Sequence, residues 1–243
     1  MENQEFNYQK SYRPLSTDRP MEVSEAFPVL MRKVYTWMTL ALAITGMTAY
    51  YVATNETLFY TIIGNKLFFY GLLIAELGLV FGVSAAIDRL SLLTATLLFI
   101  LYSVINGATM SVIFMAYTAS SIATVFFITA GTFGTMALIG YTTKADLSSI
   151  GKLLFMALIG LIIATVVNIF LRNDAITMVL SYVGVIIFIG LTAWDSQKIK
   201  QMLMLAPDGG EVAQKMALMG ALTLYLDFIN LFIYLLRIFG KRR

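Results

Sequence analysis

The stretch from Ala221 to Gly240, ALTLYLDFINLFIYLLRIFG, is apolar for about twenty residues, which is the length that crosses a bilayer as a helix. It nevertheless carries a carboxylate, Asp227, near its middle. On helical spacing Asp227 shares one stripe with Asn230 and Tyr234, while large apolar residues cover the rest of the surface. An ionisable group inside a membrane is costly without a partner, so Asp227 is a candidate functional residue. We expect its helix to lie at the centre of a bundle.

Further apolar runs precede this one, and together they predict an all-α membrane protein with seven transmembrane helices and a central C-terminal helix. Residues 1–32 are polar and are expected to form a cytoplasmic leader before a membrane domain over 33–243. The segment 55–65 is expected to be a loop. The predicted crossings are about 34–53, 66–87, 90–117, 122–141, 153–171, 175–194 and 216–239.

Composition excludes several kinds of chemistry. With 59% hydrophobic and 13% charged residues, the chain does not resemble a soluble domain. It has no cysteine and no histidine, so disulfides, thiol nucleophiles and histidine-based catalysis are ruled out. We therefore expect no enzyme activity, no catalytic residue and no cofactor. A membrane hydrolase would have to hold a metal with Glu76, Asp195 and Asp227 alone. Oxygen ligands suit calcium as a transported ion, but they also suit protons and other cations.

The lysine and arginine residues predict an orientation. The net charge of +3 lies mostly in the ends and loops, so it indicates topology and no nucleic-acid partner. With the N-terminus in the cytoplasm, most basic residues before the last helix lie on that side. The tail disagrees, because Arg237, Lys241, Arg242 and Arg243 would lie outside. Either the last helix crosses fully, or it is a re-entrant hairpin. The unbroken run from Met216 to Phe239 favours a full crossing.

A second aspartate, Asp195, follows the preceding apolar run in LTAWDSQKIK. Antiparallel packing of the last two helices would allow it to meet Asp227. Two carboxylates in a medium of low dielectric do not both stay ionised comfortably, so the pair would share one proton and respond to pH. In the alternative, Asp195 pairs with Lys198, and Asp227 is a buried protonated acid bonded to Asn230 or to backbone. Spacing alone leaves both interpretations open.

Glu76 lies inside the second predicted crossing, about three helical turns from Arg89. It either lines a cation pathway, for which Asn230 is a second candidate, or is hydrogen-bonded to a neighbouring helix. Asn106 and Asn168 also lie within predicted crossings. We expect these two amides to form hydrogen bonds between helices rather than to bind a ligand.

The C-terminal stretch, with its LYLDFINLF core and the preceding LTAWDSQKIK, resembles the signature of the Bax inhibitor family, the transmembrane Bax-inhibitor-motif proteins. The similar layout covers the chain after the leader and is typical of a bacterial, inner-membrane member. The resemblance implies a pH-sensitive calcium leak. It maps the family's paired aspartates onto Asp195 and Asp227, and its latch arginine onto Arg89. The sequence departs from the family here, because the single Arg89 follows Asp88, which could neutralise it.

The resemblance also implies a second class of function. Bacterial relatives suggest a regulatory protein that binds a membrane protease or another membrane partner. The polar leader is the feature that could serve such binding. The partners expected from the sequence are thus the lipid bilayer, calcium ions and a membrane protein.

Overall fold

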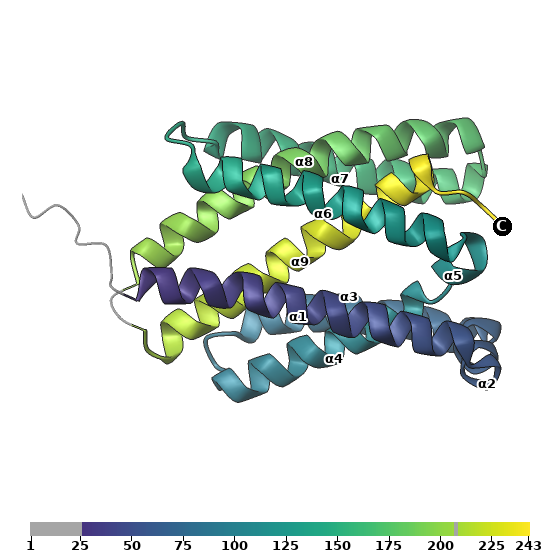
Figure 1. Ribbon diagram of the computed structural model, residues 1–243, viewed down its shortest axis with the longest axis horizontal. Coiled ribbons are helices and arrows are strands. Elements are labelled where there is room, and N and C mark those ends of the chain that lie inside the picture. Colours follow the sequence, from purple (N-terminus) through teal and green to yellow (C-terminus); the bar gives the residue numbers. More distant parts are fainter. Residues whose placement is uncertain (1–25, 207–208) are drawn as a thin grey trace, which may run out of the picture.

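A computed structural model describes residues 26–206 and 209–243, and this part of the chain is almost entirely helical (Figure 1). Most of the predicted leader lies outside the described residues. Its last residues do not form a leader, because the first helix begins at Phe27, seven residues before the predicted crossing. Pro28 occupies the first turn of that helix, where its missing N–H costs nothing.

Among the described residues seven helices are long, and shorter helical segments join some of them. The long helices are α1 (Phe27–Thr54), α3 (Lys66–Ala86), α4 (Leu92–Met110), α6 (Ala119–Thr142), α7 (Ser148–Leu171), α8 (Asp174–Met204) and α9 (Glu211–Phe239). The prediction of a loop at 55–65 is wrong, since α2 (Glu56–Phe59) and a π-helical turn (Tyr60–Gly64) fill it. The side chains of Asn55 and Asn65 cap the helices that follow them, which the loop interpretation overlooked.

The prediction of an all-α membrane protein is confirmed. Within 26–206 and 209–243, six helices are long and apolar enough to span a bilayer: α3, α6, α7, α8, α9, and α4 taken together with α5 (Ile113–Ala116). The predicted crossing 90–117 is thus interrupted between α4 and α5. The 28 residues of α1 extend over about 42 Å, but its threonines and aromatic residues keep its hydropathy below that of the others. Length and composition therefore support six spans rather than the predicted seven.

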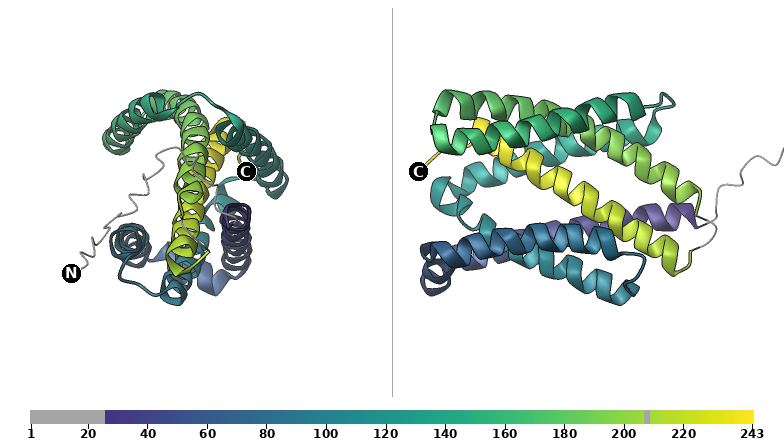
Figure 2. Two further views of the ribbon diagram at one scale, coloured as in Figure 1. Left: turned by 90° about the vertical axis from the view of Figure 1, so that its left-hand side faces the viewer. Right: turned by 180° about the vertical axis from the view of Figure 1, so that it is seen from behind.

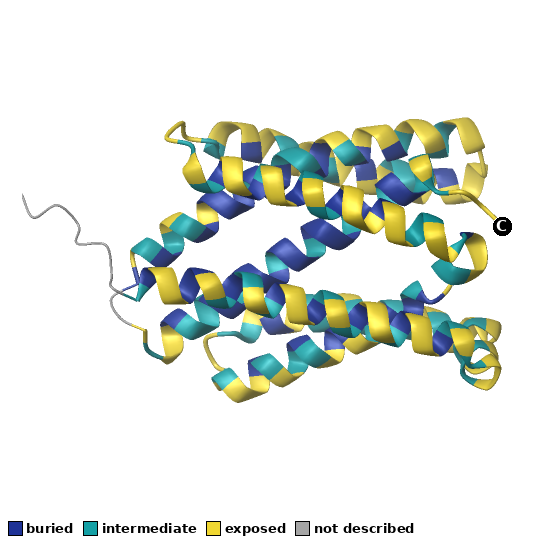
Figure 3. Ribbon diagram, viewed as in Figure 1, coloured by how far each residue is buried: buried dark blue, intermediate teal, exposed yellow. Residues whose placement is uncertain are grey.

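The last long helix, α9, lies at the centre of the bundle. It runs obliquely between one group formed by α1, α3 and α4 and another formed by α6, α7 and α8 (Figure 2). It packs against α1, α4, α6 and α8. Of its most apolar window 67% is buried, against 11–39% for the other five spans, and Figure 3 shows the contrast. The predicted central position of this helix agrees with the structure.

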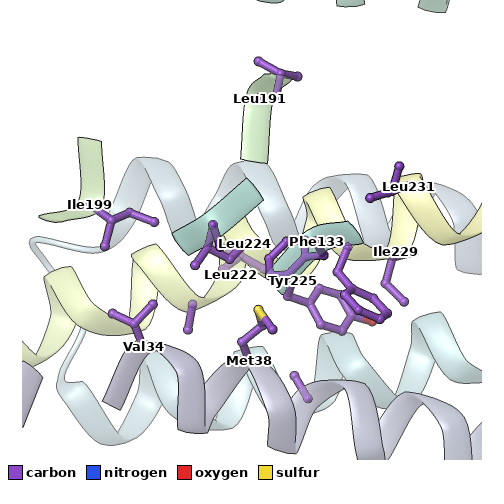
Figure 4. Packing of buried hydrophobic residues seen from close by; sticks show 14 of the residues in the cluster. Val34, Met38, Phe133, Leu191, Ile199, Leu222, Leu224, Tyr225, Ile229 and Leu231 are labelled. Carbon is purple, nitrogen blue, oxygen red and sulfur yellow. The ribbon is translucent and has the colours of Figure 1, made fainter. Parts of the chain in front are cut away.

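Buried side chains of α9 form the core with their neighbours. Figure 4 shows Leu224 and Tyr225 among Met38 of α1, Phe133 of α6 and Ile199 of α8. By contrast, large apolar side chains of α3 and α7 point outward, as expected for surfaces that face lipid. The core of the protein is thus concentrated around one helix.

Small residues let the helices approach closely, as membrane helices require. At Gly140 of α6 an added Cβ would overlap the backbone carbonyl of Ala193 in α8. At Gly107 of α4 an added Cβ would lie 2.6 Å from the carbonyl oxygen of Thr45 in α1. These two glycines therefore set how α6 packs on α8 and how α4 packs on α1.

The C-terminal tail lies at the opposite end of the bundle from the start of α1 (Figure 1). The helix α9 is continuous from Glu211 to Phe239, so the re-entrant alternative is wrong. After it, the backbone N–H of Thr118 donates to the carbonyl of Lys241 (3.1 Å), and that of Arg243 donates to the carbonyl of Ala116 (3.1 Å). The tail is thus bonded to the turn between α5 and α6.

Candidate functional site

The structure brings Asp195 of α8 and Asp227 of α9 together in the interior. Their side chains are 9% and 5% exposed, and their carboxyl groups are in hydrogen-bond contact. Two carboxylates can only accept hydrogen bonds, so a hydrogen bond between them needs a proton on one of them. The other groups of the described chain give Asp227 Oδ2 no hydrogen bond. The structure therefore brings the two predicted aspartates together, and their sharing of a proton stays a prediction.

The alternative partners proposed for the two aspartates do not bind them. The ammonium of Lys198 lies 5.2 Å above the ring of Trp194, and no ion pair joins it to Asp195 among the described residues. It influences Asp195 only through space. The side-chain amide of Asn230 donates to a backbone carbonyl of its own helix (2.8 Å) and not to Asp227.

The residues around Asp195 explain why it faces α9. The ring of Trp194 packs where Gly151 of α7 leaves room for it. The hydroxyl of Ser196 donates to a carbonyl of α6 (2.8 Å). Gln197 donates to one backbone group of the turn between α6 and α7 (2.7 Å) and accepts from another (2.9 Å). These three residues fix the rotation of α8 and leave Asp195 on the side of α9.

The predicted latch residue, Arg89, is not in contact with the pair. It lies on the exposed turn after α3, next to the equally exposed Asp88. Over the part of the chain that the structure describes, it forms no ion pair with any carboxylate. The structure thus separates Arg89 from Asp195 and Asp227, and its latch role stays a prediction.

Glu76 of α3 is bonded to the neighbouring helix α4. The hydroxyl of Thr109 donates to one carboxylate oxygen (2.6 Å), and the amide of Asn106 donates to the other (3.2 Å). Glu76 therefore has the hydrogen bonds to a neighbouring helix that one of its two interpretations expects. The expectation that both amides bond between helices is also met, because the Asn168 amide of α7 donates to the Thr177 hydroxyl of α8 (2.7 Å), as well as to a carbonyl of the turn between them.

Glu76 also lines a cavity of about 400 Å³ between α3, α4 and the last turns of α9. Tyr117 and Arg237 contribute to its wall. The guanidinium of Arg237 lies 5.5 Å from the ring centre of Tyr234, and no ion pair joins it to Glu76 in the described chain. Asn230, the other pathway candidate, does not line this cavity. Both interpretations of Glu76 are thus compatible with its position, and that of Asn230 is not supported by it.

A chain of hydroxyl groups continues from Asn106 to α9 and α1. The Tyr225 hydroxyl donates to Asn106 Oδ1 (2.9 Å) and lies 2.7 Å from the Thr45 hydroxyl, which also reaches the carbonyl of Ser103 (3.0 Å). Each hydroxyl has one proton, so two protons serve three contacts. Only two of these three hydrogen bonds therefore form at once.

The sequence alone did not predict that Tyr225, Thr45 and Thr109 belong to this network. Tyr225 is fully buried, and a buried tyrosine hydroxyl normally has a hydrogen-bond partner. A tyrosine in the middle of an apolar helix was therefore a usable signal. The hydrogen-bond partners of this tyrosine could not be predicted, because they depend on how α1, α4 and α9 align.

The three membrane carboxylates do not converge. Asp195 and Asp227 lie between α8 and α9, whereas Glu76 is held by α4. Among the residues that the structure describes, no three His, Cys, Asp or Glu side chains are placed to hold a metal ion. In the described chain these three carboxylates therefore form two separate sites and not one ligand set.

These features define an integral, multi-pass α-helical membrane protein with an aspartate pair buried between its last two helices. Comparison with known families makes the class specific. The chain belongs to the Bax inhibitor family, because the family described as inhibitor of apoptosis-promoting Bax1 matches residues 28–243. The resemblance noted in the C-terminal signature is thus confirmed over nearly the whole chain.

Curated relatives agree with this assignment. The inner membrane protein YbhL of Escherichia coli K12 is 50% identical over 220 residues, which cover 88% of this chain and 92% of the relative. The uncharacterized protein RP147 of Rickettsia prowazekii is 40% identical over 240 residues, covering 98% and 99%. A protein of Borreliella burgdorferi is 45% identical over 213 residues, covering 88% and 92%.

Proposed function

We propose that the protein is a pH-sensitive leak channel for calcium or other cations, and that protonation of the Asp195–Asp227 pair gates it. The observation that carries the proposal is the contact between these two carboxyl groups inside the bundle. The proposed location is a bacterial inner membrane, as the name of the Escherichia coli relative suggests. The N-terminus is proposed to be cytoplasmic, α1 to be the seventh crossing, and the protein to have no enzymatic role.

The pair can act as a gate because its charge changes between two packed helices. With one proton the pair carries a single negative charge, and a second proton removes it. In surroundings of low dielectric, such a change alters the interaction of α8 and α9 with any nearby cation far more than it would in water. Acid is proposed to open the pathway by removing the charge that a basic residue holds.

Arg89 is the proposed basic residue, acting through a movement of the turn after α3. A guanidinium forms a charge-assisted bond to an ionised pair and loses it when the pair is neutral. The separation of Arg89 from the pair fits an unlatched arrangement, in which a second proton has neutralised the pair. Lys198 is the next candidate, since its charge already acts on Asp195.

Glu76 is proposed to lie on the ion pathway. Its carboxylate lines the cavity near the outer ends of α4 and α9, and both of its oxygens are oriented by donors from α4. A fixed carboxylate at a cavity wall attracts cations by its charge.

Calcium flux into liposomes that contain only this protein tests the proposal. We expect flux above that of empty liposomes, increasing as the pH is lowered. Flux equal to that of empty liposomes at every pH would contradict it. A variant without residues 1–25 separates the regulatory alternative, because this deletion spares the buried Phe27 and Leu30 of α1. It should leak like the full chain, whereas binding to a membrane protein through the leader should be lost.

A further inference from the structure

A long apolar groove lies on the surface between α1 and α6, with Phe228 of α9 as its floor. Its volume is about 780 Å³. A second cavity of about 280 Å³ shares Leu42, Phe126 and Phe228 with it and continues along α1. The groove opens outward between two helices, one of which is a candidate membrane span. It belongs neither to the aspartate pair nor to the cavity at Glu76.

Small residues on α6 give the groove its depth. Ala130, Gly134 and Ala137 lie along one wall, opposite methionine and leucine side chains of α1. A Cβ added at Gly134 would meet no atom within 4 Å, so this part of the groove is open space. At its floor the rings of Phe133 and Phe228 lie 5.4 Å apart. The interior therefore suits a flexible apolar chain.

The length of the groove matches one leaflet of a bilayer. From Pro28 to Leu42, α1 rises by about 21 Å. Half of a hydrocarbon core is about 15 Å thick. A chain that enters at the N-terminal end of α1 would therefore reach past the middle of the membrane.

The mouth of the groove is basic. Arg32 contributes to its wall, is exposed, and forms no ion pair with any described residue. At the same end, Tyr141 lines the groove, its ring stacks on Phe27 (6.4 Å between centroids), and the Lys200 ammonium lies 5.0 Å above it. A molecule with a negative group at this mouth and an apolar chain inside would match both the basic mouth and the apolar interior of the groove.

We propose that the groove binds a phospholipid with an anionic headgroup. The headgroup pairs with Arg32, and one acyl chain lies between α1 and α6 against Phe228. The membrane around a spanning helix supplies such lipids. Their negative headgroup complements the basic mouth, and their acyl chains have the length of the groove. The proposal requires only that α6 spans the membrane, so it is independent of the proposed ion leak.

Native mass spectrometry of the detergent-purified full chain tests the proposal with two added probes, phosphatidylglycerol and phosphatidylcholine of identical acyl chains. We expect the anionic lipid to bind about fivefold more tightly, as one basic residue near the headgroups would give. Arg32→Gln should abolish this preference. Lys144→Gln, which removes an exposed charge after the end of α6, should keep it.

Two glycine variants test the interior of the groove. Gly134→Leu should weaken the binding of both lipids, because the new side chain fills the groove. Gly131→Leu is the matched control, since a Cβ at Gly131 also meets no atom and the residue does not line the groove. Thermal unfolding in the same detergent verifies that each variant folds. Should Gly134→Leu fail to fold, Thr39→Trp fills the groove from an exposed position on the opposite wall.

Several outcomes would overturn the proposal. One is equal binding of the two lipids by the wild type, and another is a preference that survives Arg32→Gln. Equal effects of the Gly131 and Gly134 variants on lipid binding would also show that the lipid does not bind in the groove. A dimer without bound lipid that Gly134→Leu dissociates would show that a second copy of the chain occupies it.

Discussion

Tyr225 and Asp227 lie two residues apart on α9 and serve opposite sides of the bundle. Two residues correspond to a rotation of about 200° around a helix. Tyr225 accordingly bonds toward Asn106 and Thr45 on the side of α4 and α1, while Asp227 meets Asp195 on α8. One helix thus connects the aspartate pair with the network of Glu76, so that a rotation of α9 would alter both.

Tyr225→Phe should destabilise the protein, because it removes the hydroxyl between Asn106 and Thr45. The expected loss in free energy of unfolding is about 1–3 kcal/mol, the usual cost of leaving a buried polar group without its partner. Thermal unfolding in detergent measures it. Tyr102→Phe is the control, since the ring of Tyr102 packs edge-on against Tyr225 at 5.8 Å between centroids. Equal losses in the two variants would show that the effect is not specific to the Tyr225 hydroxyl and its network.

Gly140→Ala should destabilise the contact between α6 and α8. The added methyl group overlaps the carbonyl of Ala193, and overpacking of this kind costs about 1–3 kcal/mol. Gly131→Ala, on the same helix, meets no atom and should be neutral or slightly stabilising. If the unfolding temperature fell equally in Gly140→Ala and Gly131→Ala, the close approach of α6 to α8 at Gly140 would be contradicted.

Glu76→Gln should lower cation flux while the protein stays folded. The new amide oxygen can still accept from Thr109, so the link to α4 survives while the negative charge is lost. Calcium flux into liposomes is the measurement, and Glu56→Gln, at an exposed position on α2, is the control. A folded Glu76→Gln protein with wild-type flux would assign Glu76 a structural role only.

Arg89→Ala should leak at all pH values. A latch that needs an ionised pair is complete where the pair is deprotonated and weakens as falling pH protonates it. Without the latch the closed state loses about 1–2 kcal/mol of stabilisation, and flux at high pH should rise roughly tenfold. Flux recorded across a pH series decides the matter. If Arg89→Ala keeps the wild-type profile while Lys198→Ala leaks, Lys198 is the latch.

The aspartate pair was predictable because few positions of an apolar chain can hold a carboxylate. Asp195 and Asp227 each sit beside or within an apolar run, and consecutive antiparallel helices bring such groups to the same interface. The exposed Arg89 was assigned by resemblance alone, and the structure does not bring it to the pair. Pairing across one interface follows from the order of the helices, whereas a charged residue on a turn can reach several sites.

Contacts among α1, α4 and α9 were beyond prediction for a different reason. Asn106 and Glu76 were recognised as polar groups in crossings, but their partners depend on the rotation of each helix. Close approaches such as that at Gly107 set these rotations, and they are tertiary properties. The start of α1 was misplaced because Pro28 was taken as part of a leader, although proline is favoured in a first turn.

The central claim is that the Asp195–Asp227 pair senses pH, and the pH profile of calcium flux through Asp227→Asn in liposomes tests it most directly. The amide keeps the size of the side chain but cannot titrate, so the pair loses its shared proton. Wild-type flux should rise roughly tenfold on acidification, and the flux of the folded variant should not change with pH. A folded Asp227→Asn protein whose flux follows the wild-type pH profile would contradict the claim.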